Sequence, residues 1–297
     1  MRAFVTGGHG FVGTWLRAHL EAEGDEVVAP GSEVDITDAA ATAAAMVAAA
    51  PEVVYHLAGL AHVGRSWAEP AEFLRVNAGG TLNVLEAARR VASPPRVLVV
   101  SSAEVYGHVG PDRLPLTEDA PRRPVSPYAA SKAAAEMVTV QAHLGHGTAV
   151  VVARPFNHIG PGQDPSFMLP GLAGRILAAQ RHGVAVLGVG NLSPRRDLTD
   201  VRDIVRAYRL LATAGAAGAT YNVCSGRDLS VRQVLDRLLA LTGADLAVET
   251  DPALVRAVEV PVLRGDASKL RAATGWEPVV PLDETLRAVL ASLRLRA

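Results

Sequence analysis

The sequence predicts an α/β protein built on a doubly wound parallel sheet, with a smaller mixed α/β region at one edge of that sheet. In the first half of the 297-residue chain, short β-branched runs alternate with longer helical patterns. The runs are almost entirely apolar, which is typical of parallel strands covered by helices on both faces. A glycine-rich turn separates the first run from the first helical pattern. Right-handed crossovers between such strands give a doubly wound sheet.

The first half contains the elements of this sheet in regular alternation. Strands are expected at residues 2–6, 26–29, 53–56, 97–101 and 148–153. The helices between them are expected at residues 10–23, 38–49, 72–90 and 127–143. A helix lies between each strand and the next strand along the chain. Such helical crossovers predict that the strands run parallel.

The second half is less regular and predicts the smaller region. Helices are expected at residues 169–181, 201–212, 231–241, 267–274 and 282–293, and short strands at 185–187, 220–223 and 246–249. Glycine and proline cluster at 160–163 and 188–194, which indicates loops. We therefore expect a dinucleotide-binding domain at 1–155 and a mainly substrate-binding region at 156–297. Part of that region, about 195–225, is expected to return to the large sheet, whose carboxyl edge is the usual ligand site.

Composition excludes several classes of protein. The 29 basic and 30 acidic residues give a net charge of −1, which argues against a nucleic-acid partner. A hydrophobic content of 49 % excludes intrinsic disorder. Cys224 is the single cysteine, so an intrachain disulfide or a multi-cysteine metal site is excluded, and no metal is expected. The first residues lead directly into the glycine turn, and residues 39–50 are too short a stretch to cross a bilayer, so we expect a cytoplasmic protein without membrane contact.

The glycine turn predicts a dinucleotide site. Gly7, Gly10 and Gly13 follow the first predicted strand directly and open the first helix. Glycine permits the tight turn and lets a pyrophosphate approach the backbone, and the helix N-terminus supplies N–H donors. Between a strand and a helix, this spacing is a much stronger signal than it is alone.

The end of the second predicted strand leaves the identity of the cofactor open. An acid there favours NAD, and a nearby arginine favours the 2′-phosphate of NADP. The strand ends at Ala29 with neither residue at its tip, and Glu33 comes slightly late. Ser32 could face either ribose, and Asp35 with Ile36 could contact the adenine amino group, although a plain surface acid is the alternative for Asp35. NADP is slightly favoured over NAD.

A tyrosine and a lysine form the catalytic candidate. Tyr128 and Lys132 lie four residues apart at the start of a predicted helix, which places them on one face. An ammonium beside a phenol lowers the pKa of the phenol, so the tyrosine could exchange a proton near neutral pH. The lysine could also hold the ribose hydroxyls of the cofactor. A serine hydroxyl at the end of strand 97–101, from Ser101 or Ser102, could bind the substrate oxygen that Tyr128 protonates.

Together these motifs resemble the extended short-chain dehydrogenase/reductase family, which acts on nucleotide-linked sugars. The resemblance extends over essentially the whole chain, through residues 7–13, 56–59, 77–87, 101–107, 128–132 and 154–157. It implies a Rossmann-type sheet and a catalytic triad of Ser102, Tyr128 and Lys132. The cofactor contacts that we expect are Gly7, Gly10, Phe11, Val12, Gly13, Ser32, Asp35, Ile36, Leu57, Ala58, Gly59, Asn77, Tyr128, Lys132 and Pro155.

Segments of the second half look like those of GDP-4-keto-6-deoxy-D-mannose reductases. These are residues 154–163, 190–192, 195–203 and 221–226, while 256–261 resembles a stretch shared with GDP-mannose 4,6-dehydratases and departs from it at Ala257 and Val258. Arginine forks suit phosphate oxygens, although an arginine beside an aspartate is often a solvated ion pair on an exposed helix. The expected substrate contacts are Ser102, Glu104, Asn157, His158, Arg196, Arg256 and Glu259.

The resemblance implies NAD(P)H-dependent reduction of the C4 keto group of a nucleotide-linked 4-keto-6-deoxy sugar. GDP-4-keto-6-deoxy-D-mannose is favoured as the substrate and GDP-D-rhamnose as the product. Glu104 stands where dehydratases have the acid that abstracts the C5 proton, so a GDP-mannose-type 4,6-dehydratase stays open. Ala103 replaces the neighbouring Asp of glucose-type dehydratases and counts against that branch. A 4-epimerase and a non-enzymatic NAD(P)H-binding sensor or scaffold are further alternatives.

The resemblance also implies a homodimer. In this family, helices equivalent to those at 72–90 and 127–143 pair across a two-fold axis into a four-helix bundle. Both predicted helices have long apolar faces. The alternative is that these faces belong to the protein's own core.

Overall fold

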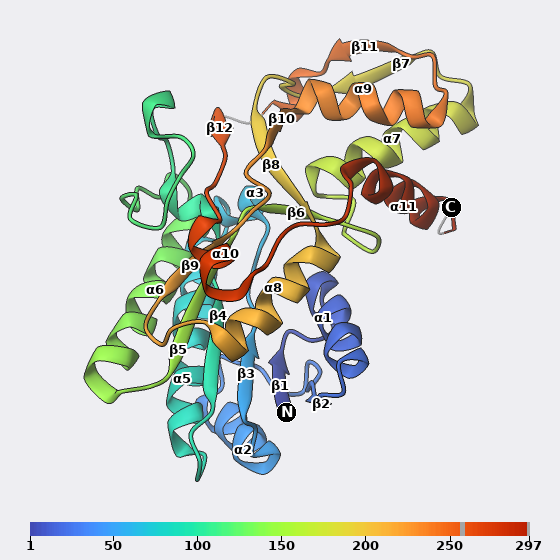
Figure 1. Ribbon diagram of the computed structural model, residues 1–297. Coiled ribbons are helices and arrows are strands. Elements are labelled where there is room, and N and C mark those ends of the chain that lie inside the picture. Colours follow the sequence, from blue (N-terminus) through green and yellow to red (C-terminus); the bar gives the residue numbers. More distant parts are fainter. Residues whose placement is uncertain (256–258, 296–297) are drawn as a thin grey trace.

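Six strands form one parallel sheet, which confirms the predicted α/β fold class. The computed structural model describes residues 1–255 and 259–295. The strand order in the sheet is β2-β1-β3-β4-β5-β9 (Figure 1). The strands are β1 (Arg2–Thr6), β2 (Glu26–Val28), β3 (Val53–His56), β4 (Arg96–Val100), β5 (Val150–Pro155) and β9 (Thr220–Val223).

The order of the strands reverses between β1 and β3. After β1 the chain adds β2 on one side, and from β3 onward it adds β4, β5 and β9 on the other. The two central strands pair in parallel with Thr6 beside His56, so both end at the same level. Connections that leave neighbouring strands in opposite directions open a crevice at the carboxyl edge. This crevice lies between the turn that begins at Gly7 and the loop that begins at Leu57.

Helices cover both faces of the sheet. On one face, α1 (Phe11–Ala22) packs against α8 (Val201–Ala214), and Leu16 and Leu20 of α1 share a core with Ile204 and Tyr208 of α8. The other face is covered by α2 (Ala39–Ala49), α5 (Gly80–Arg90) and α6 (Pro127–His146), which form a second core with the sheet. Burial on both faces explains why the strands are almost wholly apolar.

The helix predicted at 72–90 is interrupted. It begins as α4 (Pro70–Leu74), widens into the π-helical turn η1 (Arg75–Gly79) and continues as α5. The buried amide of Asn77 accepts a hydrogen bond from the Leu60 backbone N–H at 2.8 Å and donates one to Ser131 Oγ at 2.8 Å. A side chain on Gly80 would lie 2.5 Å from Ile36 Cδ1. Helical periodicity could not predict this bulge, because periodicity reflects neighbouring residues only, whereas the bulge occurs together with contacts to distant segments.

The smaller region stands above the carboxyl edge of the sheet (Figure 1). Strands β6 (Asn157–Ile159), β8 (Arg195–Asp200), β10 (Asp228–Ser230) and β12 (Val262–Leu263) form one small sheet, and β7 (Val186–Val189) pairs with β11 (Ala247–Thr250). Helices α7 (Met168–His182), α9 (Val231–Thr242) and α11 (Leu282–Arg294) pack over a core of their own. We call this region the cap. The strands β6, β8, β10 and β12 were not predicted from the sequence.

The remaining elements are short. They are α3 (Val63–Ser66), η2 (Ala103–Tyr106), η3 (Pro111–Arg113), η4 (Pro252–Leu254) and α10 (Ser268–Thr274). After β8 the chain leaves the cap through α8, and β9 lies at the edge of the large sheet. The division into a dinucleotide-binding part, 1–155, and a substrate-binding part, 156–297, stays a prediction.

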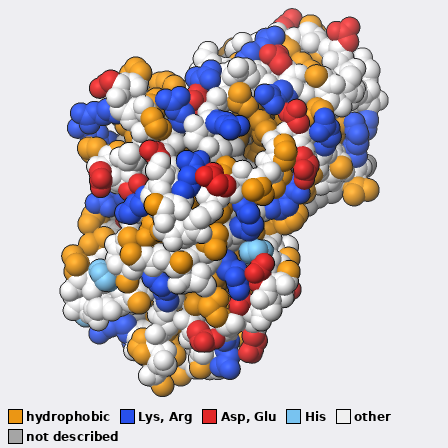
Figure 2. All heavy atoms as spheres, viewed as in Figure 1, with side chains coloured by type: hydrophobic (Ala, Val, Ile, Leu, Met, Phe, Trp, Pro, Cys, Tyr) orange, Lys and Arg blue, Asp and Glu red, His pale blue; other side chains and the backbone are white. Residues whose placement is uncertain are grey.

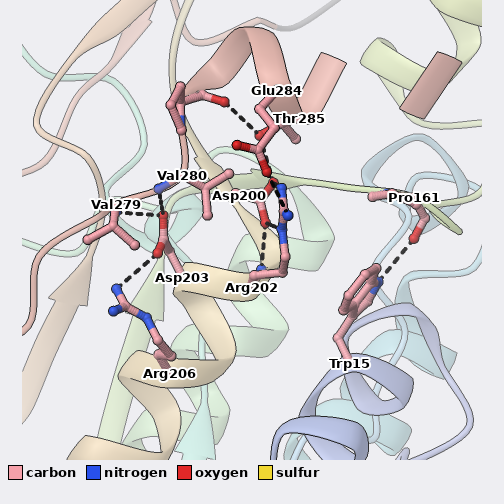
Figure 3. Close-up of polar contacts among 11 residues, drawn as sticks. Trp15, Pro161, Asp200, Arg202, Asp203, Arg206, Val279, Val280, Glu284 and Thr285 are labelled. Carbon is pink, nitrogen blue, oxygen red and sulfur yellow. Dashed lines mark hydrogen bonds and ion pairs between the residues drawn. The ribbon is translucent and has the colours of Figure 1, made fainter. Parts of the chain in front are cut away.

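Two aspartates at the start of α8 attach the C-terminal segment (Figure 3). Asp200 accepts hydrogen bonds from the Arg202 backbone N–H at 2.7 Å and from Thr285 Oγ1 at 2.6 Å. One carboxylate oxygen of Asp203 accepts hydrogen bonds from the backbone N–H groups of Val279 at 3.0 Å and Val280 at 2.9 Å. These buried carboxylates therefore hold residues 279–285 against the helix that joins the cap to the sheet.

The first helix also contacts the cap. Trp15 Nε1 of α1 donates a hydrogen bond to the Pro161 carbonyl at 3.0 Å (Figure 3). The ring of Phe11, in the first turn of α1, stacks on His158 of β6 with the two planes 11° apart. The loop that follows β6 is thus held directly above the glycine turn.

The surface mixes both signs of charge. Figure 2 shows Lys and Arg side chains interspersed with Asp and Glu over the face in view, as the net charge of −1 leads one to expect. Within the described ranges, 1–255 and 259–295, every helix is too short or too polar to cross a membrane. The same ranges contain no group of three or more His, Cys, Asp or Glu side chains placed to hold a metal ion.

Candidate active site

The turn after β1 is shaped by its glycines. Gly7 adopts a φ of +70°, which L side chains rarely tolerate. A Cβ on Gly7 would lie 2.7 Å from the Ala58 backbone nitrogen, and one on Gly13 would lie 2.1 Å from the Gly7 carbonyl oxygen. Helix α1 can therefore pack against the turn only if position 13 has no side chain.

This turn fits the phosphates of a dinucleotide. Gly10 caps α1, and the first turn of the helix contains no acidic residue. The N–H groups of its first residues have no acceptor within the helix, and the helix dipole adds positive potential at the same place. Gly10, Phe11 and Val12 all line the cavity above the turn. An anionic group can therefore approach the backbone there without meeting a side-chain charge of its own sign.

Tyr128, Lys132 and Ser102 converge at the end of β4. The hydroxyl of Ser126 caps α6 by accepting a hydrogen bond from the Ala129 N–H, so Tyr128 lies in the first helical turn and Lys132 one turn later. Lys132 Nζ donates to the Val100 carbonyl at 2.9 Å. Ser102 follows β4 and forms a hydrogen bond with the Tyr128 phenol. All three side chains are at least nine-tenths buried.

Burial controls the ionisation of this group. Desolvation raises the pKa of Tyr128 to about 12, against the opposing hydrogen bond from Ser102, and the Glu104 charge adds to the rise. Desolvation lowers the pKa of Lys132 to about 8, opposed by the charge of Glu136. The expectation that Lys132 lowers the pKa of Tyr128 is therefore wrong for this structure. Its ammonium is hydrogen-bonded to the Val100 carbonyl, and desolvation dominates the phenol.

A buried ion pair supports the triad from behind. Glu136, one turn after Lys132, accepts hydrogen bonds from Ser101 Oγ at 2.6 Å and from Arg154 Nε and Nη2 at 2.7 Å each. Burial alone would raise the pKa of Glu136, but its contacts with Arg154, Ser101 and Arg122 lower it. Ser101 precedes Ser102, so this network fixes the end of β4. Sequence analysis placed Arg154 in a family motif but gave neither Glu136 nor this pairing.

The polar residues expected to bind substrate face the same cavity from the cap. Asn157 follows β5, and its Oδ1 is buried with no partner in the described part of the chain. Arg196 lies on β8 and donates to the Val260 carbonyl at 2.8 Å. Glu259 accepts a hydrogen bond from Asn191 Nδ2 at 2.9 Å. The alternative of a solvated helical ion pair is wrong, because Arg196 lies on a strand and the adjacent Asp197 is fully buried.

One large cavity joins these groups. Its volume is about 760 Å³, and it extends from the glycine turn past the triad to the cap. Glu104 and His158 lie in its wall, and burial lowers the pKa of His158. The sequence-predicted residues that line the cavity are Gly7, Gly10, Phe11, Val12, Gly13, Leu57, Gly59, Ser102, Glu104, Tyr128, Lys132, Pro155, Asn157, His158, Arg196 and Glu259.

Comparisons with known proteins agree with this arrangement. A family model described as GDP-mannose 4,6 dehydratase matches residues 31–289. The chain is 38 % identical to the GDP-6-deoxy-D-mannose reductase of Pseudomonas aeruginosa, across 99 % of this chain and 98 % of that relative. The chain belongs to the extended short-chain dehydrogenase/reductase family. It is therefore an NAD(P)-dependent oxidoreductase of the type that modifies nucleotide-linked sugars.

Solved structures of similar proteins share the fold over the full chain. The structure of RMD from Pseudomonas aeruginosa complexed with NADPH has a TM-score of 0.92 at 37 % identity and covers 100 % of this chain and 99 % of its own. The Thermus thermophilus UDP-glucose 4-epimerase in complex with NAD has a TM-score of 0.88 at 30 % identity, with 99 % of both chains covered. Members similar to this chain thus bind either form of the cofactor.

Five of the residues expected to contact the cofactor lie outside the cavity. The Ala58 N–H donates to Thr6 Oγ1, and both ends of the Asn77 amide are used within the protein. Ile36 is buried in the core, while the Asp35 carboxylate accepts a hydrogen bond from the Thr37 N–H. Ser32 is exposed on the loop after β2. Arg256 lies outside the described residues.

Arg175 and Tyr208 are among the cavity residues that sequence analysis missed. Arg175 lies on the inner side of α7, and desolvation lowers its pKa against the opposing charge of Asp251. Tyr208 of α8 is fully buried, and its hydroxyl has no partner in the described part of the chain. Neither belongs to a motif, because each reaches the cavity only through the packing of its helix. An arginine on the apolar face of a helix was the available signal for Arg175.

Proposed function

We propose that the protein reduces the C4 keto group of GDP-4-keto-6-deoxy-D-mannose and forms GDP-D-rhamnose. The observation that supports this proposal most strongly is one cavity whose two ends differ in chemistry and which is lined between them by Ser102, Tyr128 and Lys132. One end is the glycine turn, and the other is a polar wall in the cap. Similarity to a GDP-6-deoxy-D-mannose reductase over almost the whole chain supports this choice of substrate.

NADPH is the proposed reductant, since the similar structure from Pseudomonas aeruginosa is described as complexed with it. When bound, the reduced nicotinamide supplies the hydride that C4 of the sugar accepts. The glycine turn would hold its pyrophosphate through backbone N–H groups. Lys132 would hold the nicotinamide ribose, because its ammonium lies at the end of β4 beside Gly59.

The triad would handle the proton. The raised pKa of Tyr128 keeps the phenol protonated at neutral pH, so it can donate to the alkoxide that forms at C4. Ser102, hydrogen-bonded to that phenol, would orient the same oxygen. The three side chains are at least nine-tenths buried, and the lower local dielectric strengthens each of these interactions.

The cap would bind the nucleotide. Arg196 and Arg175 are the cavity's described guanidinium groups, and their planar forks suit diphosphate oxygens. Asn157 would donate through its amide to the diphosphate or to a sugar hydroxyl. Glu259, held by Asn191, would accept from the guanine edge or a ribose hydroxyl. The sequence also assigns Arg256 to this end.

A 4,6-dehydratase is the second candidate, and Glu104 favours it. This carboxylate lines the cavity and acts electrostatically on Tyr128, so it lies close to the proposed reacting carbon. The family model that matches the chain is also described as a dehydratase. Ala103, where glucose-type dehydratases have an acid, is buried in the core and supplies no second carboxylate.

Steady-state turnover tests the proposal. Purified protein with NADPH should consume GDP-4-keto-6-deoxy-D-mannose with one NADPH oxidised per sugar, and Tyr128→Phe should lower kcat by about 10²- to 10⁴-fold. Tyr55→Phe is the matched control, because that buried hydroxyl has no partner in the described chain and does not line the cavity. Full activity of Tyr128→Phe would refute the proposed role. Conversion of GDP-mannose without net NADPH oxidation would indicate a dehydratase, interconversion of C4 epimers an epimerase, and cofactor binding without any turnover a sensor or scaffold.

We also propose that two copies associate through α5 and α6. These helices pack side by side on one face of the sheet. Leu82 on α5 and Met137 on α6 remain 40 % and 48 % exposed, an apolar pair that a second copy would cover. Light scattering should give twice the chain mass, and Met137→Asp should shift it toward the monomer. A monomeric wild-type protein would refute this association.

A further inference from the structure

The end of β2 meets the glycine turn at a small polar surface, which we call the strand-tip cluster. It consists of His9, Arg17, Ala29 and Glu33. In a doubly wound sheet, the residues at this strand end recognise the adenosine ribose of the dinucleotide. The sequence places no arginine next to the strand tip. The structure brings one there from the first helix.

Arg17 reaches the cluster from α1. It lies one helical turn beyond Gly13, and its Cδ would be 3.2 Å from a Cβ on Gly8, so the side chain passes directly beside the glycine turn. Its Nη1 donates to His9 Nδ1 at 3.4 Å, and no carboxylate within 1–255 and 259–295 forms an ion pair with it. Its Nε is buried without a partner in the same ranges. The guanidinium is thus held in place but retains donors for a ligand.

His9 completes the arrangement. Its ring nitrogen Nε2 lies 3.2 Å from the Ala29 carbonyl, which ties the glycine turn to the end of β2. With Nδ1 facing Arg17, the imidazole bridges the guanidinium and the strand tip. His9 is exposed and Arg17 is half-buried, on the side where the adenosine half of a dinucleotide bound on the turn would extend.

We propose that Arg17, positioned by His9, binds the 2′-phosphate of NADP(H). A guanidinium presents paired donors that match phosphate oxygens, and its charge attracts a group that carries nearly two negative charges at neutral pH. The proposal deepens the proposed function and rests on its choice of cofactor. It assigns the recognition of NADP(H) to a residue of α1 rather than to the loop after β2.

Glu33 opposes this preference and sharpens the test. Its carboxylate accepts a hydrogen bond from the Gly31 N–H at 2.8 Å. Backbone hydrogen bonds from Glu33 and Gly31 lower the pKa of this carboxyl, with a further contribution from His9. The ionised group therefore repels a phosphate at the cluster. In an NAD-specific site the same carboxylate would instead accept from the ribose 2′-hydroxyl.

Binding of two cofactor fragments tests the proposal. Adenosine 2′,5′-bisphosphate and 5′-AMP differ in the 2′-phosphate alone, and calorimetry gives the Kd of each. The wild-type protein should bind the bisphosphate more tightly. Arg17→Ala should weaken the bisphosphate by about 10- to 100-fold, the range for a charged hydrogen bond, and change 5′-AMP by less than about twofold. His9→Ala should act in the same direction, and Glu33→Gln should tighten the bisphosphate.

The matched control is Arg232→Ala, an exposed arginine of the cap that pairs with Asp236. It should leave both constants unchanged. Equal binding of the two fragments by the wild type, or equal weakening of both by Arg17→Ala, would overturn the proposal. Weaker 5′-AMP binding by Glu33→Gln would overturn it in favour of an NAD site. Because neither fragment contains a sugar substrate, failure here is distinct from failure of keto-sugar reduction, which would still be measurable with NADH.

Discussion

Lys132 sets the pH range in which the proposed site can work. Its ammonium is removed from water, so its pKa falls to about 8 and it stays mainly protonated at pH 7. Tyr128, with a pKa of about 12, stays protonated throughout the same range. Lys132 loses its proton well before the phenol does.

We therefore predict that NAD(P)H binding to the free enzyme weakens as the pH rises through about 8. Below this value the ammonium can donate to the ribose hydroxyls as a charged group, and above it the neutral amine binds them less strongly. Fluorescence titration of NADPH at several pH values measures the change. Lys132→Arg, which remains charged, should bind with little pH dependence across this range. The same decline in Lys132→Arg would contradict the assignment.

Individual side chains also show where sequence reasoning stops. Ser102, Tyr128 and Lys132 could be predicted because a motif of fixed spacing brings them together. Glu136 and Arg154 are 18 residues apart on different elements, and their pairing depends on how α6 lies against β5. Asn77 fits a family motif, yet its amide braces the loop at Leu60 and does not line the cavity. The motifs thus identified Arg154 and Asn77 but did not predict which residues they contact.

At the scale of elements, the large sheet was more predictable than the cap. Its strands are apolar runs, and their apolar composition indicates that they are buried. In contrast, β8 begins with Arg195, Arg196 and Asp197, and β12 has two residues. Such strands exist because of their partners: β8 pairs with β6, β10 and β12, which lie far away in sequence. The local sequence pattern does not indicate which distant strands will pair, so these strands were not predicted.

The junction of β1 and α1 yields a prediction of its own. Gly13→Ala would place a Cβ 2.1 Å from the Gly7 carbonyl oxygen, so the helix or the turn must move. We expect a lower Tm and NADPH binding at least about tenfold weaker, because the turn's N–H groups lose their alignment. Differential scanning fluorimetry and NADPH titration measure the two effects.

Gly174→Ala in α7 is the control for this substitution. A Cβ there meets no atom within 4 Å, and alanine is a better helix former than glycine by about 1 kcal/mol. Stability should therefore hold or rise slightly. If Gly13→Ala behaves like Gly174→Ala, the prediction that position 13 must lack a side chain for the turn to pack is wrong.

At the scale of the molecule, function depends on how the cap is held above the sheet. The cavity is formed by both parts, so their relative position sets the distance between the cofactor and the sugar. Trp15, through Pro161, and the stacked rings of Phe11 and His158 join the glycine turn to the cap loop. Asp200 and Asp203 attach the C-terminal segment to α8 (Figure 3). Sequence alone predicted two regions but not these contacts, which join residues far apart in the chain.

Removing one attachment should loosen the segment it holds. Asp203→Ala takes the acceptor from the Val279 and Val280 amides, and we expect a loss of stability of about 1.5–3 kcal/mol. Hydrogen exchange at these two amides should become faster. Asp283→Ala removes a partner of Arg237 in an exposed ion pair and should change stability by about 1 kcal/mol or less. Unchanged exchange in Asp203→Ala would contradict this role.

The proposed function requires that hydride reaches C4 of a keto sugar nucleotide at the triad. The most direct measurement uses NADPH deuterated on the transferring face, with GDP-4-keto-6-deoxy-D-mannose as the substrate and NMR of the sugar product. We expect one deuterium at C4 of the 6-deoxyhexose, with one NADPH oxidised for each product molecule, and loss of the signal in Tyr128→Phe. Product without deuterium at C4, or consumption of the sugar without oxidation of NADPH, would contradict the proposed function.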